Sequence, residues 1–355
     1  FFMYDRGMPL WAGRWLSWFF SSMGGVPVRR GRRLDLKALK AVRHYLVNGP
    51  FPVTIAPEGA TNGHGEVISP LESGTAQVAF WAVEDLHQAQ RSEQVLVVPV
   101  GLQYFYPRPD WAALERLLGR MERDCGLVVP TWDNPGQRSP QAYGQRLLSL
   151  GHHLLNQMEG FYQRLYGPLP ATIDQGGDRL QTLLHHALVV GEEYFKLPST
   201  GSLETRCRRL EEAGWTHIYR EDLSQPHQGC PVDQGLANWM AEAAALQVRP
   251  MRLVESFVAV RDSYIQGQPS FERLAETSLI LFDLVERVKG TRVPRRPQLG
   301  RRHAVISLAE PINVSQRWSA YQPSRPAARV AVERLTQDLQ SALEGLILPT
   351  GSSSA

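Results

Sequence analysis

The sequence predicts an α/β fold with a mostly parallel central sheet flanked by helices, joined to a large helical insertion or a second helical domain. Strand and helix patterns alternate through residues 1–106, which is typical of parallel pairing. Between residues 107 and 300 the apolar side chains recur mostly with the helical period. A strand pattern and a helix pattern then return before the C-terminus.

Residues 8–23 predict a helix, because Trp11, Trp15 and Trp18 are spaced to share one face. Such an apolar stripe is most often packed into a core, and we favour that interpretation. The alternative is a helix that lies in a bilayer interface, which suits tryptophan beside arginine. Residues 26–28 follow as a short strand, and Pro27 is typical of a sheet edge.

Three further patterns complete the first part of the chain: a helix over 34–49, a strand over 51–56 and a strand over 94–104. Another helix lies between the two strands. It begins either at a capping box formed by Ser69 and Glu72, with proline at its first position, or near Ser73. The alternation of strands and helices favours parallel pairing.

The middle of the chain predicts a series of helices, over 108–126, 139–166, 178–196, 202–214, 234–247 and 250–289. A basic, proline-rich link precedes a strand over 303–314 and a helix over 324–347. We therefore divide the chain into an α/β core over 1–106 and 301–348, a helical insertion or domain over 107–300, and a flexible tail over 349–355.

Positive charge is concentrated at the front of the chain. The whole sequence of 355 residues carries a net charge of +3, but residues 1–50 hold nine Lys and Arg against two Asp, a local +7. A basic front end suits phosphate groups, on nucleic acid, on lipid headgroups or on a nucleotide-bearing substrate.

Cysteine usage and hydropathy narrow the classes of protein. The three cysteines are far apart and form no C-x-x-C, which argues against a disulfide scaffold or a zinc knuckle and favours a reducing compartment. No apolar run approaches the ~18–20 residues of a membrane span. No signal-peptide pattern is present, and the chain opens without methionine, so we expect a fragment.

Several short motifs occur in an order that resembles the glycerophospholipid acyltransferase family, the type that acylates lysophosphatidate. They read GGVPVRRG, APEG, LESGTAQVA, VVPVGLQY and VISLAEPI. The residues that match the family's second, third and fourth blocks, together with a glycine of L-E-S-G-T-A, are Gly25, Val28, Arg30, Gly31, Pro57, Glu58, Gly59, Gly74, Val98, Pro99 and Val100. The resemblance covers about 1–106 and 303–347, and motifs in order are stronger than any one alone.

The resemblance implies that the second and third blocks hold a phosphate-bearing acyl acceptor, and it gives this role to Arg30, Glu58 and Gly59, with Arg29 beside them. The residues themselves agree in part, because Glu58 follows a predicted strand and arginine forms a forked donor suited to phosphate. Thr61 stands where the family has arginine, so the identity of the acceptor is open. No metal or redox cofactor is implied.

The family's first block, H-x-x-x-x-D, supplies a general base and its orienting carboxylate, and it precedes the second block. No such motif precedes Gly24, so the resemblance places the catalytic dyad upstream of Phe1 and none of its residues in this chain. One H-x-x-x-x-D does occur, from His217 to Asp222, in a predicted loop after every block that it should precede. We interpret it as a chance match.

The remaining histidines have simpler interpretations. His64 lies in the polar loop after Glu58 and is either a solvated residue, which we favour, or a substrate contact. The adjacent pairs at 152–153 and 185–186 do not suit a shared metal ion, because neighbouring residues of a helix point in different directions.

The leading hypothesis is an acyltransferase that moves a fatty acyl group from acyl-CoA or acyl-carrier protein to a hydroxyl of a lysophospholipid or glycerol phosphate. The alternative is a catalytically inactive lipid-binding protein that lacks the His/Asp dyad. We expect a cytoplasmic protein attached peripherally to a membrane surface. A nucleic-acid partner is not expected, because the basic front end carries no recognised nucleic-acid motif.

Overall fold

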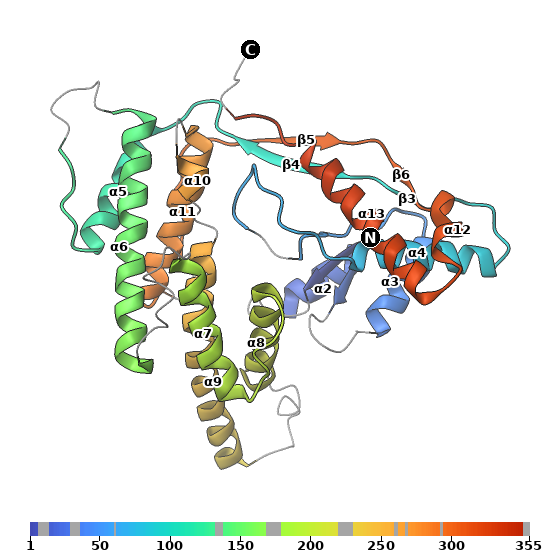
Figure 1. Cartoon of the computed structure of the whole chain (residues 1–355), viewed down its shortest axis with the longest axis horizontal. Helices are drawn as coiled ribbons and strands as arrows, with labels where there is room; N and C mark the ends of the chain where they lie inside the picture. The colour runs from blue at the N-terminus through green and yellow to red at the C-terminus, as the bar shows by residue number, and fades with distance from the viewer. Residues whose placement is uncertain are drawn as a thin grey trace. The chain divides into compact units, whose positions relative to one another are not determined.

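The computed structural model describes residues 1–5, 14–28, 36–59, 62–131, 138–167, 179–218, 230–258, 262–266, 269–291 and 294–350 (Figure 1). The chain divides into two compact units, which are Phe1–Tyr104 with Ala304–Pro349, and Phe105–His303 with Thr350–Ala355. The first unit mixes strands and helices and the second is helical. The predicted α/β class with a large helical part is therefore confirmed.

The first unit is built around β1 (Phe2–Asp5), which pairs in parallel with β2 (Gly25–Val28). On its other side, Phe2 forms a parallel bridge with Thr54. The strand predicted over 51–56 is thus reduced to a single bridge. Prolines at 52 and 57 have no N–H to donate, so an extended ladder cannot form across this segment.

The remaining strands of this unit pair in two further two-stranded sheets, β3 (Leu96–Val97) with β6 (Ile312–Asn313) and β4 (Val100–Phe105) with β5 (His303–Leu308). The β3–β6 pair is antiparallel. The described strands therefore form small sheets, and the expected mostly parallel central sheet is wrong in extent. The predicted strand 94–104 divides at Pro99, which cannot donate to a ladder.

Helix α2 (Arg14–Ser22) packs on β1 and β2 through one face only. The ring of Phe20 meets Phe2 at 5.7 Å and Tyr4 at 5.1 Å, both edge-on. Trp15 and Trp18 are 66% and 72% exposed. The favoured interpretation of this helix as a core element is therefore wrong for these tryptophans, because the underlying strand pair offers only one face to bury. Trp11 lies outside the described residues.

Four helical segments complete the first unit: α3 (Leu36–Asn48), α4 (Gly74–Gln88), the short α12 (Trp318–Tyr321), which follows a 3₁₀ turn at Ser315–Arg317, and α13 (Arg325–Glu344). Helix α4 begins after Ser73, so the second of the two predicted starts is correct and the capping box at Ser69 is not formed. Phe80 of α4 is fully buried and stacks on Tyr321 at 4.5 Å. These helices thus share one apolar core with β3 and β6.

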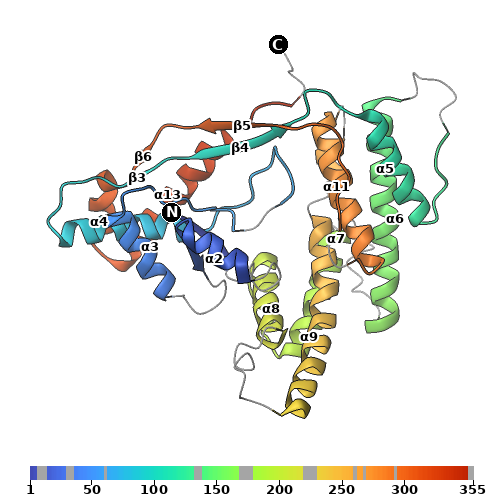
Figure 2. The same cartoon turned by 180° about the vertical axis from the view of Figure 1, so that it is seen from behind.

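The second unit consists of α5 (Trp111–Asp124), α6 (Pro140–Tyr166), α7 (Arg179–Phe195), α8 (Leu203–Ile218), α9 (Pro231–Val258), α10 (Asp262–Ile265) and α11 (Phe271–Val288). Its long helices run side by side, as Figure 2 shows. The break predicted between 247 and 250 is wrong, because α9 continues through Pro250. Val248 and Met251 are buried on either side of the proline, and their packing outweighs its cost.

Two buried ion pairs fix which helices of this unit lie together. Arg146 of α6 donates to both carboxylate oxygens of Glu122 on α5, at 2.8 and 2.7 Å. Arg206 of α8 makes the same forked contact with Glu192 of α7, also at 2.8 and 2.7 Å. Because a buried charge without its partner is costly, these pairs select one arrangement of otherwise similar apolar helices.

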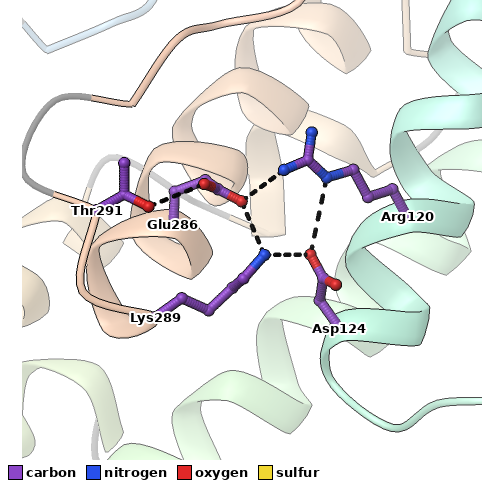
Figure 3. Close-up of polar contacts among 5 residues, drawn as sticks. All are labelled: Arg120, Asp124, Glu286, Lys289 and Thr291. Atoms are coloured by element: carbon purple, nitrogen blue, oxygen red, sulfur yellow. Dashed lines mark hydrogen bonds and ion pairs between the residues drawn. The ribbon is translucent and has the colours of Figure 1, made fainter.

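A third charged cluster joins the ends of α5 and α11 (Figure 3). Glu286 Oε1 accepts from Arg120 at 2.8 Å and from Lys289 at 2.9 Å, and its Oε2 accepts from Thr291 at 3.0 Å. Lys289 also donates to Asp124 at 2.9 Å, which closes the cluster. The Lys289 ammonium lowers the pKa of the Glu286 carboxyl.

We predict that Glu286→Gln lowers the free energy of unfolding by about 1–2 kcal/mol, because it removes the charge at the centre of this cluster while its partners remain half-exposed. Since the pKa of Glu286 is lowered by folding, its contribution is present above the ordinary carboxyl pKa and is lost as the pH falls through the folded value. Denaturant titration at neutral and acidic pH measures both effects.

The matched control is Glu333→Gln, which breaks an exposed pair with Arg329 on α13 and should change stability by less than ~0.5 kcal/mol. An equal decrease in the free energy of unfolding for both variants would contradict the role of the cluster. So would a decrease for Glu286→Gln that is the same at neutral and at acidic pH.

Tyr162 of α6 carries a buried hydroxyl that has no hydrogen-bond partner among the described residues. Burial raises the pKa of this hydroxyl, which therefore stays protonated. An unsatisfied buried polar group costs roughly 1–3 kcal/mol. We predict that Tyr162→Phe raises the midpoint of denaturation, with a gain of about 1 kcal/mol. A loss of that size would show that the hydroxyl makes a stabilising contact.

Candidate functional site

The parallel segments of the first unit all end at the same edge. β1 pairs in parallel with β2 and bridges in parallel to Thr54, so the chain leaves Val28 and Ile55 in one direction. Val28 is followed in sequence by Arg29 and Arg30, and Ile55 by Ala-Pro-Glu-Gly. Open α/β sheets bind ligands beyond the carboxyl ends of such strands. The Pro57-Glu58-Gly59 turn therefore lies beyond the carboxyl end of a parallel segment, which is the edge where such sheets bind ligands.

The Pro57-Glu58-Gly59 segment is a tight turn. Gly59 has φ of 71°, in the left-handed region that glycine adopts without strain. The carbonyl of Pro57 accepts from the backbone N–H of Glu72 at 2.8 Å, which ties the turn to the segment just before α4. Glycine is needed at position 59 because the chain turns there with a positive φ. The turn leaves the Glu58 side chain against the following loop.

The carboxylate of Glu58 is half-buried, and one of its oxygens braces the loop. Oε2 accepts from the backbone N–H of Ser69 at 2.8 Å and from the amide of Asn62 at 3.4 Å. The other oxygen, Oε1, has no hydrogen-bond partner among the residues that the structure describes. Glu58 thus holds the loop with one oxygen, and within the described part of the chain the second oxygen is an acceptor that makes no hydrogen bond.

Asn62 is the second brace of this loop. Its amide donates to the Val67 carbonyl at 2.7 Å and to the Ser69 hydroxyl at 3.0 Å, and its carbonyl oxygen accepts from the backbone N–H of His64 at 2.9 Å. Sequence reasoning missed this role and placed Ser69 in a helix cap. The Asn62-Gly63 pair was a usable signal, since asparagine often bonds to its own backbone two residues on.

The loop is also anchored to distant parts of the first unit. The side chain of Gln103 on β4 is buried and donates to the Gly65 carbonyl at 3.0 Å and to the Leu348 carbonyl at 3.3 Å. Its oxygen accepts from the Leu348 N–H at 2.7 Å. Gln340 of α13 accepts from the N–H of Leu71 at 3.1 Å. Nothing local in the sequence marks these glutamines.

The other predicted residues have different outcomes. Arg29, Arg30, Gly31 and Thr61 lie outside the described residues. A methyl group on Gly25 would lie 2.7 Å from the carbonyl oxygen of Phe20, so this glycine lets α2 approach β2. Gly74 opens α4 and has no atom within 4 Å of the place where a methyl would stand. Pro99 accepts at its carbonyl from Ala309 at 3.1 Å.

The histidines that the sequence analysis singled out at 185, 186 and 217 pack against neighbouring side chains. His217 belongs to the last turn of α8, in contrast to the predicted loop, and stacks on Phe195 with ring centroids 5.6 Å apart; Asp222 lies outside the described residues. His185 contacts Arg206 at 2.7 Å, whereas His186 meets the ring of Tyr162 at 5.9 Å. The neighbouring histidines thus face different partners, as helix geometry predicts.

A second polar surface is the groove between α3 and α4, lined in part by Lys40, Arg43 and Arg91. Arg43 donates to Asp85 at 2.9 Å, and Arg91 donates to Glu93 at 2.7 Å. Both guanidinium groups are therefore already neutralised by carboxylates, and the groove offers less free positive charge than its residue types suggest.

Residues 4–103 match the family model Acyltransferase. This part of the chain is an acyltransferase-family domain. The match includes β2, the Glu58 turn and most of β4, and it leaves the helical unit unmatched. A general acyltransferase function follows for this domain. No curated protein matches the chain. No solved structure matches it either.

We predict that Gln103→Met loosens the loop of the acyltransferase domain. The substitution conserves volume but removes the three hydrogen bonds that the buried Gln103 amide makes to the backbone of Gly65 and Leu348, which should cost roughly 2 kcal/mol. Denaturant titration measures the decrease in the free energy of unfolding. The rate of limited proteolysis between residues 58 and 69 measures how well the loop is held.

The control is Gln94→Met, which removes an exposed bond to Asn313 and should leave both readouts near wild type. If Gln103→Met is as stable and as protease-resistant as Gln94→Met, Gln103 does not anchor the loop.

Proposed function

We propose that this chain belongs to an enzyme that transfers a fatty acyl group from the thioester of acyl-CoA or acyl-carrier protein to a hydroxyl of a lysophospholipid or glycerol phosphate. The observation that supports it most is the family match over 4–103, which contains the braced Glu58 turn at the carboxyl edge of the parallel strands. We further propose that the protein is cytoplasmic and attaches peripherally to a membrane.

In this proposal the acceptor binds where the chain leaves β2 and the Glu58 turn. Arg29 and Arg30 present forked donors suited to the acceptor's phosphate. The available Oε1 of Glu58 accepts a hydrogen bond from a hydroxyl of the acceptor. Gly59 carries no side chain, so the glycerol unit can approach the backbone. Thr61, where the family has arginine, leaves fewer positive contacts for the phosphate.

The chemistry exchanges one acyl bond for another. The acceptor oxygen attacks the thioester carbonyl, a tetrahedral oxyanion forms, and its collapse makes the new ester and releases the thiol. The hydroxyl proton must pass to a base, because a neutral alcohol attacks a thioester slowly. The resemblance assigns that base to the histidine of an H-x-x-x-x-D motif ahead of the second block, and the motif that begins at His217 does not have this position.

We predict that Glu58→Gln weakens the binding of lysophosphatidate at least tenfold. Glutamine retains an oxygen for the Ser69 N–H, so the loop keeps its brace, but the charged acceptor oxygen is lost. Titration calorimetry with lysophosphatidate measures the affinity, and thiol release from acyl-CoA measures transfer. Glu72→Gln, which changes an exposed carboxylate of the same loop, should bind like the wild type. Equal affinities for all three proteins would overturn the role of Glu58.

The second candidate function is lipid binding without acyl transfer. It is favoured by one observation, that the H-x-x-x-x-D found within the given residues begins at His217, outside the matched residues 4–103. Tight lysophosphatidate binding that depends on Glu58, with no thiol released from acyl-CoA by this chain, supports this function over transfer. Thiol release that requires the acceptor excludes it.

A further inference from the structure

Helix α2 has two apolar faces, and the fold uses only one. Phe20 points inward and meets the aromatic rings of β1. The outer face is formed by Trp15, Trp18 and Phe19, with Met23 in the turn directly after the helix, and these residues follow the i, i+3, i+4, i+8 pattern of one helical side. Their exposed fractions are 66%, 72%, 41% and 58%. Several large apolar side chains exposed on one helical side are typical of an interaction surface.

The inner face of α2 packs closely on the strand pair. Gly25 lacks the methyl group that would collide with the Phe20 carbonyl, so α2 lies directly on the strand pair. Phe20 is half-buried there, between the rings of Phe2 and Tyr4. The tryptophans therefore contribute little to this packing, and their exposure costs free energy that a partner would recover.

Residue type and charge identify that partner as a lipid surface. Tryptophan is the side chain most suited to the boundary between headgroups and acyl chains, because its ring is apolar and its N–H is polar. Among the described residues, the exposed Lys37 and Lys40 lie on α3, which packs on the same strand β2 as α2 does. The sequence of residues 1–50 as a whole carries a net +7. Positive charge beside an aromatic face suits anionic lipid.

We propose that the outer face of α2 inserts into the interface of a bilayer that contains anionic lipid. No described helix is long and apolar enough to cross a membrane, and α2 spans only 9 residues. The helix therefore lies along the surface. The inference deepens the proposed function and rests on it in one respect, since a lysophospholipid acceptor would be met at this surface.

A second exposed apolar stripe provides an internal comparison. On α9 it consists of Val232, Leu236, Trp239, Met240 and Leu246. Its neighbours in sequence include Asp233 and Glu242, and no Lys or Arg occurs between residues 231 and 248. Anionic lipid repels acidic residues beside an apolar face. The two exposed apolar faces therefore differ in the charge of their neighbours, and only that of α2 suits anionic lipid. Trp239 is 70% exposed, which matches Trp18 closely and makes it a suitable control.

The test is sedimentation of the full chain with phosphatidylcholine vesicles that contain phosphatidylglycerol, and with pure phosphatidylcholine vesicles. We compare the wild type, Trp15→Ser/Trp18→Ser and Trp239→Ser. Quenching of tryptophan fluorescence by brominated acyl chains reports insertion directly. Circular dichroism establishes that each variant is folded, and the milder Trp18→Tyr, which keeps an interfacial ring, should retain most binding.

The expected result is that wild type and Trp239→Ser bind the anionic vesicles and are quenched, while the double variant loses at least tenfold in binding and loses the quenching. Pure phosphatidylcholine should bind all proteins weakly. Wild-type binding by the double variant, equal losses in both serine variants, or equal binding to the two vesicle types would overturn the proposal. None of these measurements requires acyl transfer. Failure of the thiol-release assay would therefore count against the proposed activity alone, and failure of vesicle binding against the proposed membrane surface alone.

Discussion

The candidate site depends on the backbone pairing of β1 between two parallel neighbours. Phe2 donates to the Gly24 carbonyl at 3.3 Å on one side, and Phe1 accepts from Thr54 at 2.8 Å on the other. This short strand fixes the direction in which the chain leaves both β2 and the segment before Pro57. The arrangement requires glycine at position 25, because a side chain there would push α2 away from the β1–β2 pair. The position of the Glu58 turn thus follows from one strand of 4 residues.

The loop after Glu58 shows how distant segments give a polar loop a fixed shape. Its backbone groups are satisfied by Gln103 and Gln340, which lie on β4 and α13. A loop left to itself would bond to water and sample many conformations, at an entropic cost of roughly 1–2 kcal/mol per residue on ordering. Here α13 is held by apolar packing and β4 by its pairing with β5, so that cost is offset by the rest of the unit.

Prediction from sequence succeeded where the determinants are local. The amphipathic period and Ser139, which accepts from Ala142 at the start of α6, fix helices with little reference to the rest of the chain. The sequence also identified the Pro-Glu-Gly turn, through a motif. It failed where determinants are distant: apolar packing carries α9 through Pro250, and strand pairing depends on partners more than 200 residues away. The anchoring by Gln103 belongs to the same class.

The two interpretations of Glu58, a turn residue that braces its own loop and a ligand contact, are compatible in this geometry. Oε2 is committed to Ser69 and Asn62, so the carboxylate cannot rotate freely and Oε1 is held in one place. A group positioned by its own structural bonds loses little conformational freedom when a ligand arrives, which is the basis of preorganised binding. The structural role of the first oxygen therefore strengthens the case for the second as a binding group.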